Sequence, residues 1–450
     1  MRPPTSGRPN LGTVIAACAA AWLAAACADD ASPPPPAAHP PTAPAVADPA
    51  FTIDGVTAWN LIGNALTPGD DQLVLTVAAP ADVAVVDVWV DDGPGQRLIR
   101  TAGAPQFTGT VAIAGLGPGD HTLTFGADSA DVGFAAVGFV RTHPLYFMVS
   151  TDWDFSDPGQ FALDAHDRLR ADHPDIRFTQ FVGPYTYTDP MVTDARKAEL
   201  TTWLTTRRDA HGDEIGLHIH PWCHFVVAAG LPCITDQSTL YQTDVTGYTV
   251  KVAAYGETDF ATLLRAADDI FTARGLGKPV TFRAGGWTAS AETMRALAAT
   301  GYVADTSANN WARMEEWNRP GGYGFYGWNM MAWSTIGDTS QPYYPNVDDA
   351  QAATPPRVPL LEVPDNAIMV DYVTTQEMKD IFAANWPGGA LAAPTTFMMG
   401  FHPSANFDQT ELARVDGILD HADRYLASRH QGPVVYEILR NLPTVWQVPN

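Results

Sequence analysis

The chain has 450 residues, of which 46% are hydrophobic, and its formal net charge is -24. This length exceeds one ordinary domain and suits two or three, and the hydrophobic content is enough for a large core. Such an acidic chain would be repelled by phosphate backbones, which argues against nucleic acid as a partner.

The first residues have the composition of an export signal. Arg2 and Arg8 precede an apolar stretch at 11–26, which is too short to be a retained transmembrane helix. The small residues before Cys27 resemble a bacterial lipobox, in which the cysteine becomes lipidated. We therefore expect a signal peptide at 1–26 and an exported protein anchored to the membrane of the cell envelope, or to the outer surface, through a lipid on Cys27. Ordinary cleavage nearby is the alternative.

Two segments of different character follow. Residues 27–50 are rich in proline and alanine, which is typical of a stiff, extended tether. Residues 51–142 alternate β-prone runs with Gly, Pro and Asp turns, which predicts a small all-β sandwich. Its segment 115–123 resembles a turn and strand of bacterial immunoglobulin-like modules, and we expect a spacer or packing partner, with glycan binding as the alternative. The expected strands are 72–77, 83–90, 107–113, 121–125 and 132–140.

From residue 143 to residue 450, apolar strand candidates alternate with segments of helical periodicity. About seven strands in this arrangement predict a parallel α/β domain, a distorted (β/α) barrel. In such folds the active site lies at the carboxyl ends of the strands. The expected strands are 145–151, 176–182, 214–220, 279–284, 302–306, 358–364 and 395–402, and the expected helices are 158–171, 193–210, 260–274, 290–300 and 408–428.

Two short segments carry residues suited to one metal site. Asp152 and Asp154 would project from one face of an extended strand, and so would His218 and His220. His224 would share a face with His220 if a helix begins at the intervening proline. Carboxylate with imidazole is a ligand set for Zn²⁺ or a similar divalent ion, and a spare carboxylate beside it can act as a general base on water. This combination predicts a hydrolase.

The four cysteines are expected to have different roles. Cys18 lies in the predicted signal, and Cys27 is the candidate for lipidation. In an exported protein the remaining two, Cys223 and Cys233, are expected to form a disulfide. Buried free thiols, or metal ligation by Cys223, are the alternatives.

The order and spacing of these motifs resemble the polysaccharide deacetylases of the NodB-homology group, carbohydrate esterase family 4, over roughly residues 143–430. Each resembling segment lies at the end of an expected strand, so the family's pattern and the strand pattern point to the same edge of the sheet. The segments are the aspartate pair at 152–154, Glu-Ile-Gly-Leu-His at 214–218, Phe-Arg-Ala-Gly-Gly-Trp at 282–287 and Phe-His-Pro at 401–403.

The resemblance implies a role for each matching residue. Asp152 would be the catalytic base, and Asp154 would bind the metal together with two histidines. Arg283 would orient Asp152, and a cation beside a carboxylate also keeps it ionised. His402 would be the general acid that protonates the leaving group. The implied cofactor is a divalent metal, zinc first, with cobalt or nickel as alternatives.

The chain departs from the family's pattern in two of these motifs. The Glu-Ile-Gly alignment selects His218, which we pair with His220, whereas the family's His-x-x-x-His spacing would select His220 and His224. The third motif usually ends in Pro-Tyr, but Gly-Gly-Trp stands at 285–287, which puts the expected oxyanion-stabilising backbone N–H in question. Asp305 matches the fourth motif loosely and would tune the general acid or the orienting arginine.

The connection between the strands expected at 302–306 and 358–364 is long and unusually aromatic. Long loops often act as functional lids, and aromatic faces suit stacking on sugar rings. The alternative is a satellite core that covers the edge of the barrel. With the nearby third motif, this region supplies the candidate substrate-binding residues Trp287, Asp305, Trp311, Tyr326 and Trp328.

These features together predict a metal-dependent hydrolase. Its expected activity is the removal of N-acetyl or O-acetyl groups from a cell-envelope or extracellular polysaccharide, which would be its principal partner. One alternative is a catalytically inactive, glycan-binding surface lipoprotein. Another is a hydrolase of a non-sugar C–N amide, for which a closed pocket would be expected in place of an open groove.

Overall fold

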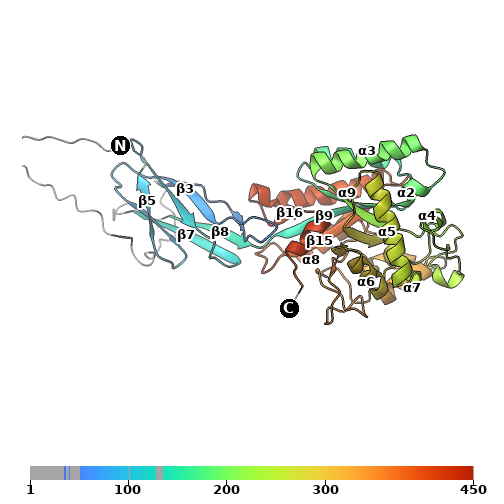
Figure 1. Cartoon of the computed structure of the whole chain (residues 1–450). Coiled ribbons are helices and arrows are strands. Elements are labelled where there is room, and N and C mark those ends of the chain that lie inside the picture. Colours follow the sequence, from blue (N-terminus) through green and yellow to red (C-terminus); the bar gives the residue numbers. More distant parts are fainter. Residues whose placement is uncertain (1–34, 37–39, 41–50, 101, 128–134, 449–450) are drawn as a thin grey trace, which may run out of the picture.

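The computed structural model shows two bodies of different architecture, one built of strands and one of strands and helices (Figure 1). The predicted signal peptide, Cys27 and most of the tether at 27–50 lie outside the described residues. Among the helices that are described, none is both long and apolar enough to cross a membrane. The residues described are 35–36, 40, 51–100, 102–127 and 135–448.

The described residues of the N-terminal body form eight strands. They are β1 (Thr52–Asp54), β2 (Trp59–Leu61), β3 (Gln72–Ala78), β4 (Val86–Val90), β5 (Gln96–Arg100), β6 (Gln106–Ala112), β7 (Gly119–Ala127) and β8 (Ala135–Thr142). They pair in the order β1-β3-β6-β5-β4-β7-β8-β2, antiparallel except for β2 with β8. Alternate residues of β3 are buried in an aliphatic and aromatic core. Each strand expected here corresponds to an observed one, whereas the two-layer sandwich and the immunoglobulin-like character stay predictions.

The C-terminal body is built on a curled parallel sheet of seven strands, as the sequence predicts. They are β9 (Leu145–Asp152), β10 (Phe178–Val182), β11 (Glu214–Ile219), β12 (Thr281–Ala284), β13 (Ala304–Asp305), β14 (Leu361–Glu362) and β15 (Thr395–Phe401). Their order is β14-β13-β12-β11-β10-β9-β15, and all pairs are parallel. In this order β14 and β15 are the two edges, so the sheet is a half-barrel, not a closed barrel. A short strand, β16 (Val434–Tyr436), pairs with the start of β9 beside β10.

Nine helices are described in this body. They are α1 (Gln160–Asp172), α2 (Tyr185–Thr188), α3 (Asp194–His211), α4 (Cys223–Ala228), α5 (Glu257–Ala273), α6 (Ala291–Ala299), α7 (Tyr323–Ala332), α8 (Thr375–Asn385) and α9 (Gln409–Ala422). All five predicted helices are present, as α1, α3, α5, α6 and α9. Capping residues set several ends: α3 begins after Thr193, whose side chain accepts from a backbone N–H, and ends at the left-handed Gly212. The last helix ends at Ala422, earlier than predicted, and short 3₁₀ turns follow.

Helices cover the parallel sheet (Figure 1), and all eight residues of β9 are buried. The pairing register fixes what meets at the carboxyl edge of the sheet. His218 lies opposite Arg283, and Asp152 lies opposite the penultimate residue of β10. Because parallel strands end at the same edge, polar residues at these ends converge there.

Candidate metal centre and active site

A carboxylate and two imidazoles come together at this edge. Asp154 lies two residues beyond β9, His218 lies in β11, and His220 follows that strand directly. Each offers one ligand atom, and the three atoms lie within 4.8 Å of one another. Oδ1 of Asp154 is 3.0 Å from Nε2 of His218 and 3.3 Å from Nε2 of His220. The structure therefore brings together the carboxylate and the pair of histidines that the sequence favours.

The hydrogen bonds of the two histidines test whether this group fits a cation. Nδ1 of His218 is 2.9 Å from the carbonyl oxygen of Arg283, and Nδ1 of His220 is 2.8 Å from that of Tyr248. Carbonyl oxygens only accept, so the proton of each neutral imidazole sits on Nδ1. Both Nε2 lone pairs then face Oδ1 of Asp154, and Nε2 of His220 is buried without a hydrogen bond. Converging electron pairs with fixed tautomers fit a divalent metal.

His224 lies apart from this group. Its Nδ1 is 2.9 Å from Oγ1 of Thr188, its Nε2 is 3.9 Å from Asp189, and its ring stacks on Trp222. The reason is local: the predicted helix start at Pro221 is wrong, because α4 begins at Cys223. Residues 220 and 224 therefore do not share one helical face, and the alternative ligand pair is not assembled.

We expect His224→Ala to leave zinc affinity unchanged. The imidazole contacts a threonine and an aspartate outside the candidate metal group, so its removal should not alter the ligand set. Titration of the metal-free protein with zinc against a competing chelator measures this. His218→Ala is the matched control and should lose most of its affinity; a comparable loss in His224→Ala would contradict the placement of the ligands.

Asp152 is held by a buried arginine beside the metal group. Nη1 of Arg283 donates to Oδ1 of Asp152 at 3.0 Å and to Oγ of Ser150 at 2.8 Å. Its Nη2 lies 3.3 Å from Oδ2 of Asp365, and the arginine side chain is fully buried. Burial raises the pKa of Asp365 to about 6, although Arg283 opposes the shift. Arg283 thus orients Asp152 through one oxygen and leaves the other free, while Asp365, which the sequence reasoning missed, positions the guanidinium.

His402 approaches Asp154 from the end of β15. Its Nδ1 is hydrogen-bonded to Oδ2 of Asp371, and its Nε2 lies 3.7 Å from Oδ1 of Asp154. Ligand-type atoms of Asp152, Asp154 and His402 also lie within 4.8 Å of one another. Burial lowers the pKa of His402, but Asp371 and Asp154 outweigh it and raise that pKa to about 10. Asp371, a second residue missed from sequence, therefore orients His402 and stabilises its protonated form.

Gly285 makes room for the second histidine. A Cβ at position 285 would lie 2.6 Å from both Cγ and Nδ1 of His220, far inside van der Waals contact. Any side chain there would push the imidazole out of place. Gly285, at which the chain departs from the deacetylase pattern, therefore supplies the space that the His220 ring occupies.

The predicted substrate-binding residues separate into two groups. Trp287 lines the cavity over the metal group, where its Nε1 donates to Asp365. The others face elsewhere: Trp311 and Tyr326 pack against each other, and the Trp328 ring lies under the ammonium group of Lys251. Asp305 is fully buried and pairs in register with Glu362 on β14, and burial raises its pKa to about 6. Asp305 contacts neither His402 nor Arg283, so its expected tuning role is not supported by a contact.

Other aromatic rings form the walls of the site. They come from the predicted lid and from three further loops. A neighbouring hollow of about 280 Å³ shares Asp154, Tyr248 and His402 with the cavity over the metal group and continues past Phe155 and Glu316. The site is therefore a groove open along the surface. The aromatic residues that line it are Phe155, Tyr241, Tyr248, Trp317, Phe325 and Tyr372, with Trp287.

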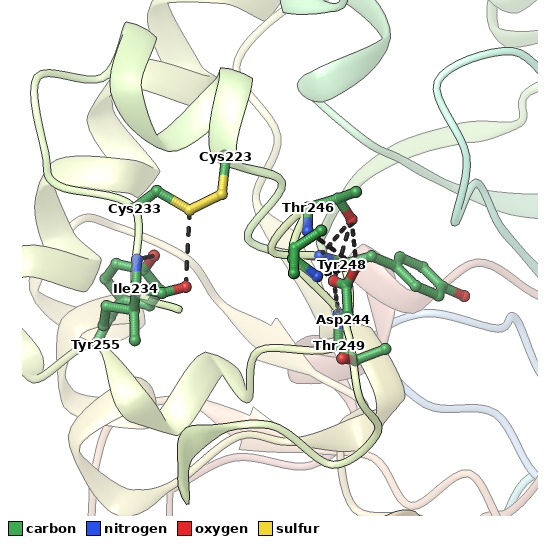
Figure 2. Close-up of a disulfide and its surroundings, with 9 residues drawn as sticks. Cys223, Cys233, Ile234, Asp244, Thr246, Tyr248, Thr249 and Tyr255 are labelled. Atoms are coloured by element: carbon green, nitrogen blue, oxygen red, sulfur yellow. Dashed lines mark hydrogen bonds between the residues drawn. A yellow bond between two sulfur atoms is a disulfide. The ribbon is translucent and has the colours of Figure 1, made fainter. Parts of the chain in front are cut away.

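A disulfide closes the loop that follows His220. Cys223 and Cys233 are bonded, which confirms the predicted pairing (Figure 2). The backbone N–H of Cys223 donates to the carbonyl of Thr246 at 2.7 Å, which ties the far end of the same loop to the cysteine. The segment that carries Tyr248 into the site is thus hydrogen-bonded to a disulfide-bonded cysteine.

The sequence matches no protein-family model and no curated protein. Among solved structures, the chain is similar to one named as a polysaccharide deacetylase from Mycobacterium smegmatis, with 12% identity over 65% of this chain and 87% of that one and a TM-score of 0.39. It is also similar to a family 4 carbohydrate esterase from Streptomyces lividans in complex with acetate, with 11% identity over 69% of this chain and 100% of that one and a TM-score of 0.33. At these values the likeness does not itself establish an activity or a substrate.

Proposed function

We propose that the protein is a metal-dependent hydrolase that removes N-acetyl or O-acetyl groups from a polysaccharide. The observation that carries this proposal is the convergence at Oδ1 of Asp154. Two histidine lone pairs meet it there, with Asp152 and His402 beside it. We further propose, from the first 27 residues of the sequence, that the protein is exported and attached by a lipid on Cys27, so that a cell-envelope or extracellular glycan is its substrate.

Asp154, His218 and His220 would hold the metal. When bound, a divalent ion there would polarise the acyl carbonyl and acidify water. The free oxygen of Asp152 accepts a proton from the attacking water, whose oxygen joins the acyl carbon. The carbon–nitrogen bond then breaks, and His402 gives its Nε2 proton to the departing nitrogen, so that acetate and a free amine result. For an O-acetyl group the proton goes to the departing oxygen.

The buried ion pairs keep these two proton-transfer groups in place. Arg283 fixes Asp152 on the side away from its free oxygen, and Asp371 fixes the ring of His402 so that Nε2 points toward Asp154. A carboxylate and an imidazolium close to the same carboxylate suit an acid–base pair that acts on a single bond. The groove favours a polymer over a small amide, because it extends along the surface beyond the metal group.

Release of acetate tests this function. The purified protein, stripped of metal and reloaded with zinc, is incubated with an N-acetylated aminosugar oligomer and with an O-acetylated polysaccharide, and acetate is measured. We expect release from one of these that stops when the metal is removed and is absent in Asp154→Ala. A zinc-loaded protein that binds the oligomers but releases no acetate would favour a glycan-binding surface protein instead.

A further inference from the structure

Tyr248 contacts two members of the metal group at once. Its hydroxyl donates to Oδ2 of Asp154 at 2.7 Å, and its backbone carbonyl accepts from Nδ1 of His220 at 2.8 Å. Its ring also stacks on the His220 imidazole, with 4.3 Å between centroids and 25° between planes. A single loop residue therefore holds both a carboxylate and an imidazole of the candidate site.

The two oxygens of Asp154 consequently differ. Oδ1 faces Nε2 of His218 and of His220, whereas Oδ2 is taken by the Tyr248 hydroxyl. A carboxylate oxygen only accepts, so the Tyr248 hydroxyl is the donor of this hydrogen bond. A carboxylate held in this way offers only one oxygen to a metal.

The position of Tyr248 is fixed by the loop around it. Asp244 accepts from the backbone N–H groups of Thr246 and Thr249, at 2.9 and 3.1 Å, which folds a tight turn (Figure 2). A Cβ at Gly247 would lie 2.2 Å from the carbonyl oxygen of Pro221, so the turn packs directly on the segment after His220. Figure 2 shows the Tyr248 ring projecting from this turn on the side away from the disulfide. The turn and its packing therefore fix the position of the Tyr248 side chain.

We propose that Tyr248 is a positioning residue that restricts Asp154 to ligation through one oxygen and so makes the site selective for a small, four-coordinate ion. Zn²⁺ accepts such a tetrahedral set of nitrogen and oxygen ligands. Mn²⁺ favours more oxygen ligands in octahedral geometry, so a second carboxylate oxygen would serve it better. The inference rests on the metal site of the proposed function, but it can be tested without any catalytic assay.

Tyr248→Phe removes the hydroxyl and leaves the ring and the backbone carbonyl. We expect the zinc dissociation constant to rise by roughly 10- to 100-fold, as loss of an outer-shell partner generally causes. The constant for manganese should rise less, so that the preference for zinc over manganese falls. Competition titrations of the metal-free full chain with each ion alone measure both constants, and the circular-dichroism melting curve checks that the variant is folded.

Tyr302→Phe is the matched control. Its hydroxyl also donates to a partly buried carboxylate, Asp268, at 2.8 Å, but away from the metal group, so its metal affinities should equal those of the wild type. Asp244→Asn is a second test of the inference, because it keeps the Tyr248 phenol but weakens the turn that positions it. We expect it to lower zinc affinity by a smaller factor than Tyr248→Phe does. Unchanged zinc affinity in Tyr248→Phe, or an equal loss in Tyr302→Phe, would overturn the inference.

The two proposals fail in different ways. A wild-type protein that binds zinc but releases no acetate would overturn the proposed function and leave the role of Tyr248 standing. If the protein releases acetate but its preference for zinc over manganese is the same with and without the Tyr248 hydroxyl, the proposed function stands and the inference about Tyr248 is overturned. A wild-type protein that binds neither ion would overturn both.

Discussion

Asp152→Asn is expected to lower the rate of acetate release by roughly 10²- to 10⁴-fold, the range that a positioned general base contributes. The amide keeps the size of the carboxylate, and its oxygen can still accept from Arg283, so the packing of the buried site should persist. What is lost is the oxygen that takes the proton from water. Initial rates on an acetylated oligomer at saturating zinc measure the effect, and the zinc dissociation constant should stay close to that of the wild type.

Asp164→Asn is the control for this substitution, because Asp164 is an exposed residue of α1 and its change should leave the rate unchanged. Two results would contradict the assignment. Loss of zinc with loss of activity in Asp152→Asn would mean that Asp152, and not Asp154, is the carboxylate ligand. Full activity with zinc bound would mean that another group takes the proton.

Gly285→Ala is expected to weaken zinc binding by more than the roughly 10- to 100-fold that loss of an outer-shell partner costs, because a ligand itself is displaced. The added methyl would stand 2.6 Å from the ring of His220, which is buried and hydrogen-bonded to the carbonyl of Tyr248. The ring cannot swing away without breaking that bond. Zinc titration, together with the melting temperature of the metal-free protein, measures the loss of affinity and the strain.

Gly389→Ala controls for the change of residue type, since a Cβ there meets no atom within 4 Å. The double variant Gly285→Ala/His220→Ala isolates the clash. If the two side chains collide, removing the imidazole should restore much of the stability lost in Gly285→Ala, so the two effects will not add. Additive losses of stability would show that the glycine matters for another reason.

The seven parallel strands could be predicted because each is a short apolar run between helical segments, and the register of a parallel sheet then brings strand ends together. Asp152, His218 and Arg283 could be placed at one edge on that basis alone. Asp305 shows the limit of this reasoning. It too ends a strand, but it faces Glu362 on the neighbouring strand and is sealed in the interior. Strand ends can be inferred from a pattern, whereas the direction of one side chain depends on its neighbours.

The site residues that could not be predicted from the sequence lie on loops. Asp371 follows four apolar residues at 367–370, and an acid after such an apolar run was the available signal. Tyr248 gives no local signal, because a turn around Asp244 and a cross-link at Cys223 determine its position. From the aromatic connection, Phe325 and Trp317 line the cavity, whereas the predicted Tyr326 and Trp328 do not.

The pairing of β16 with β9 constrains how this protein can reach its native state. β9, which leads to Asp152 and Asp154, has β15 along one edge and shares its other edge between β10 and β16. Two of these three partners, β15 and β16, lie near the C-terminal end of the chain, so they are translated after most of the domain. Such non-local pairing slows the folding of a domain, because the long intervening chain must be closed into a loop first. The start of β9 therefore reaches its full set of neighbours only after residues 434–436 have been synthesised, whereas the end that carries Asp152 pairs with β10, which is translated soon after it.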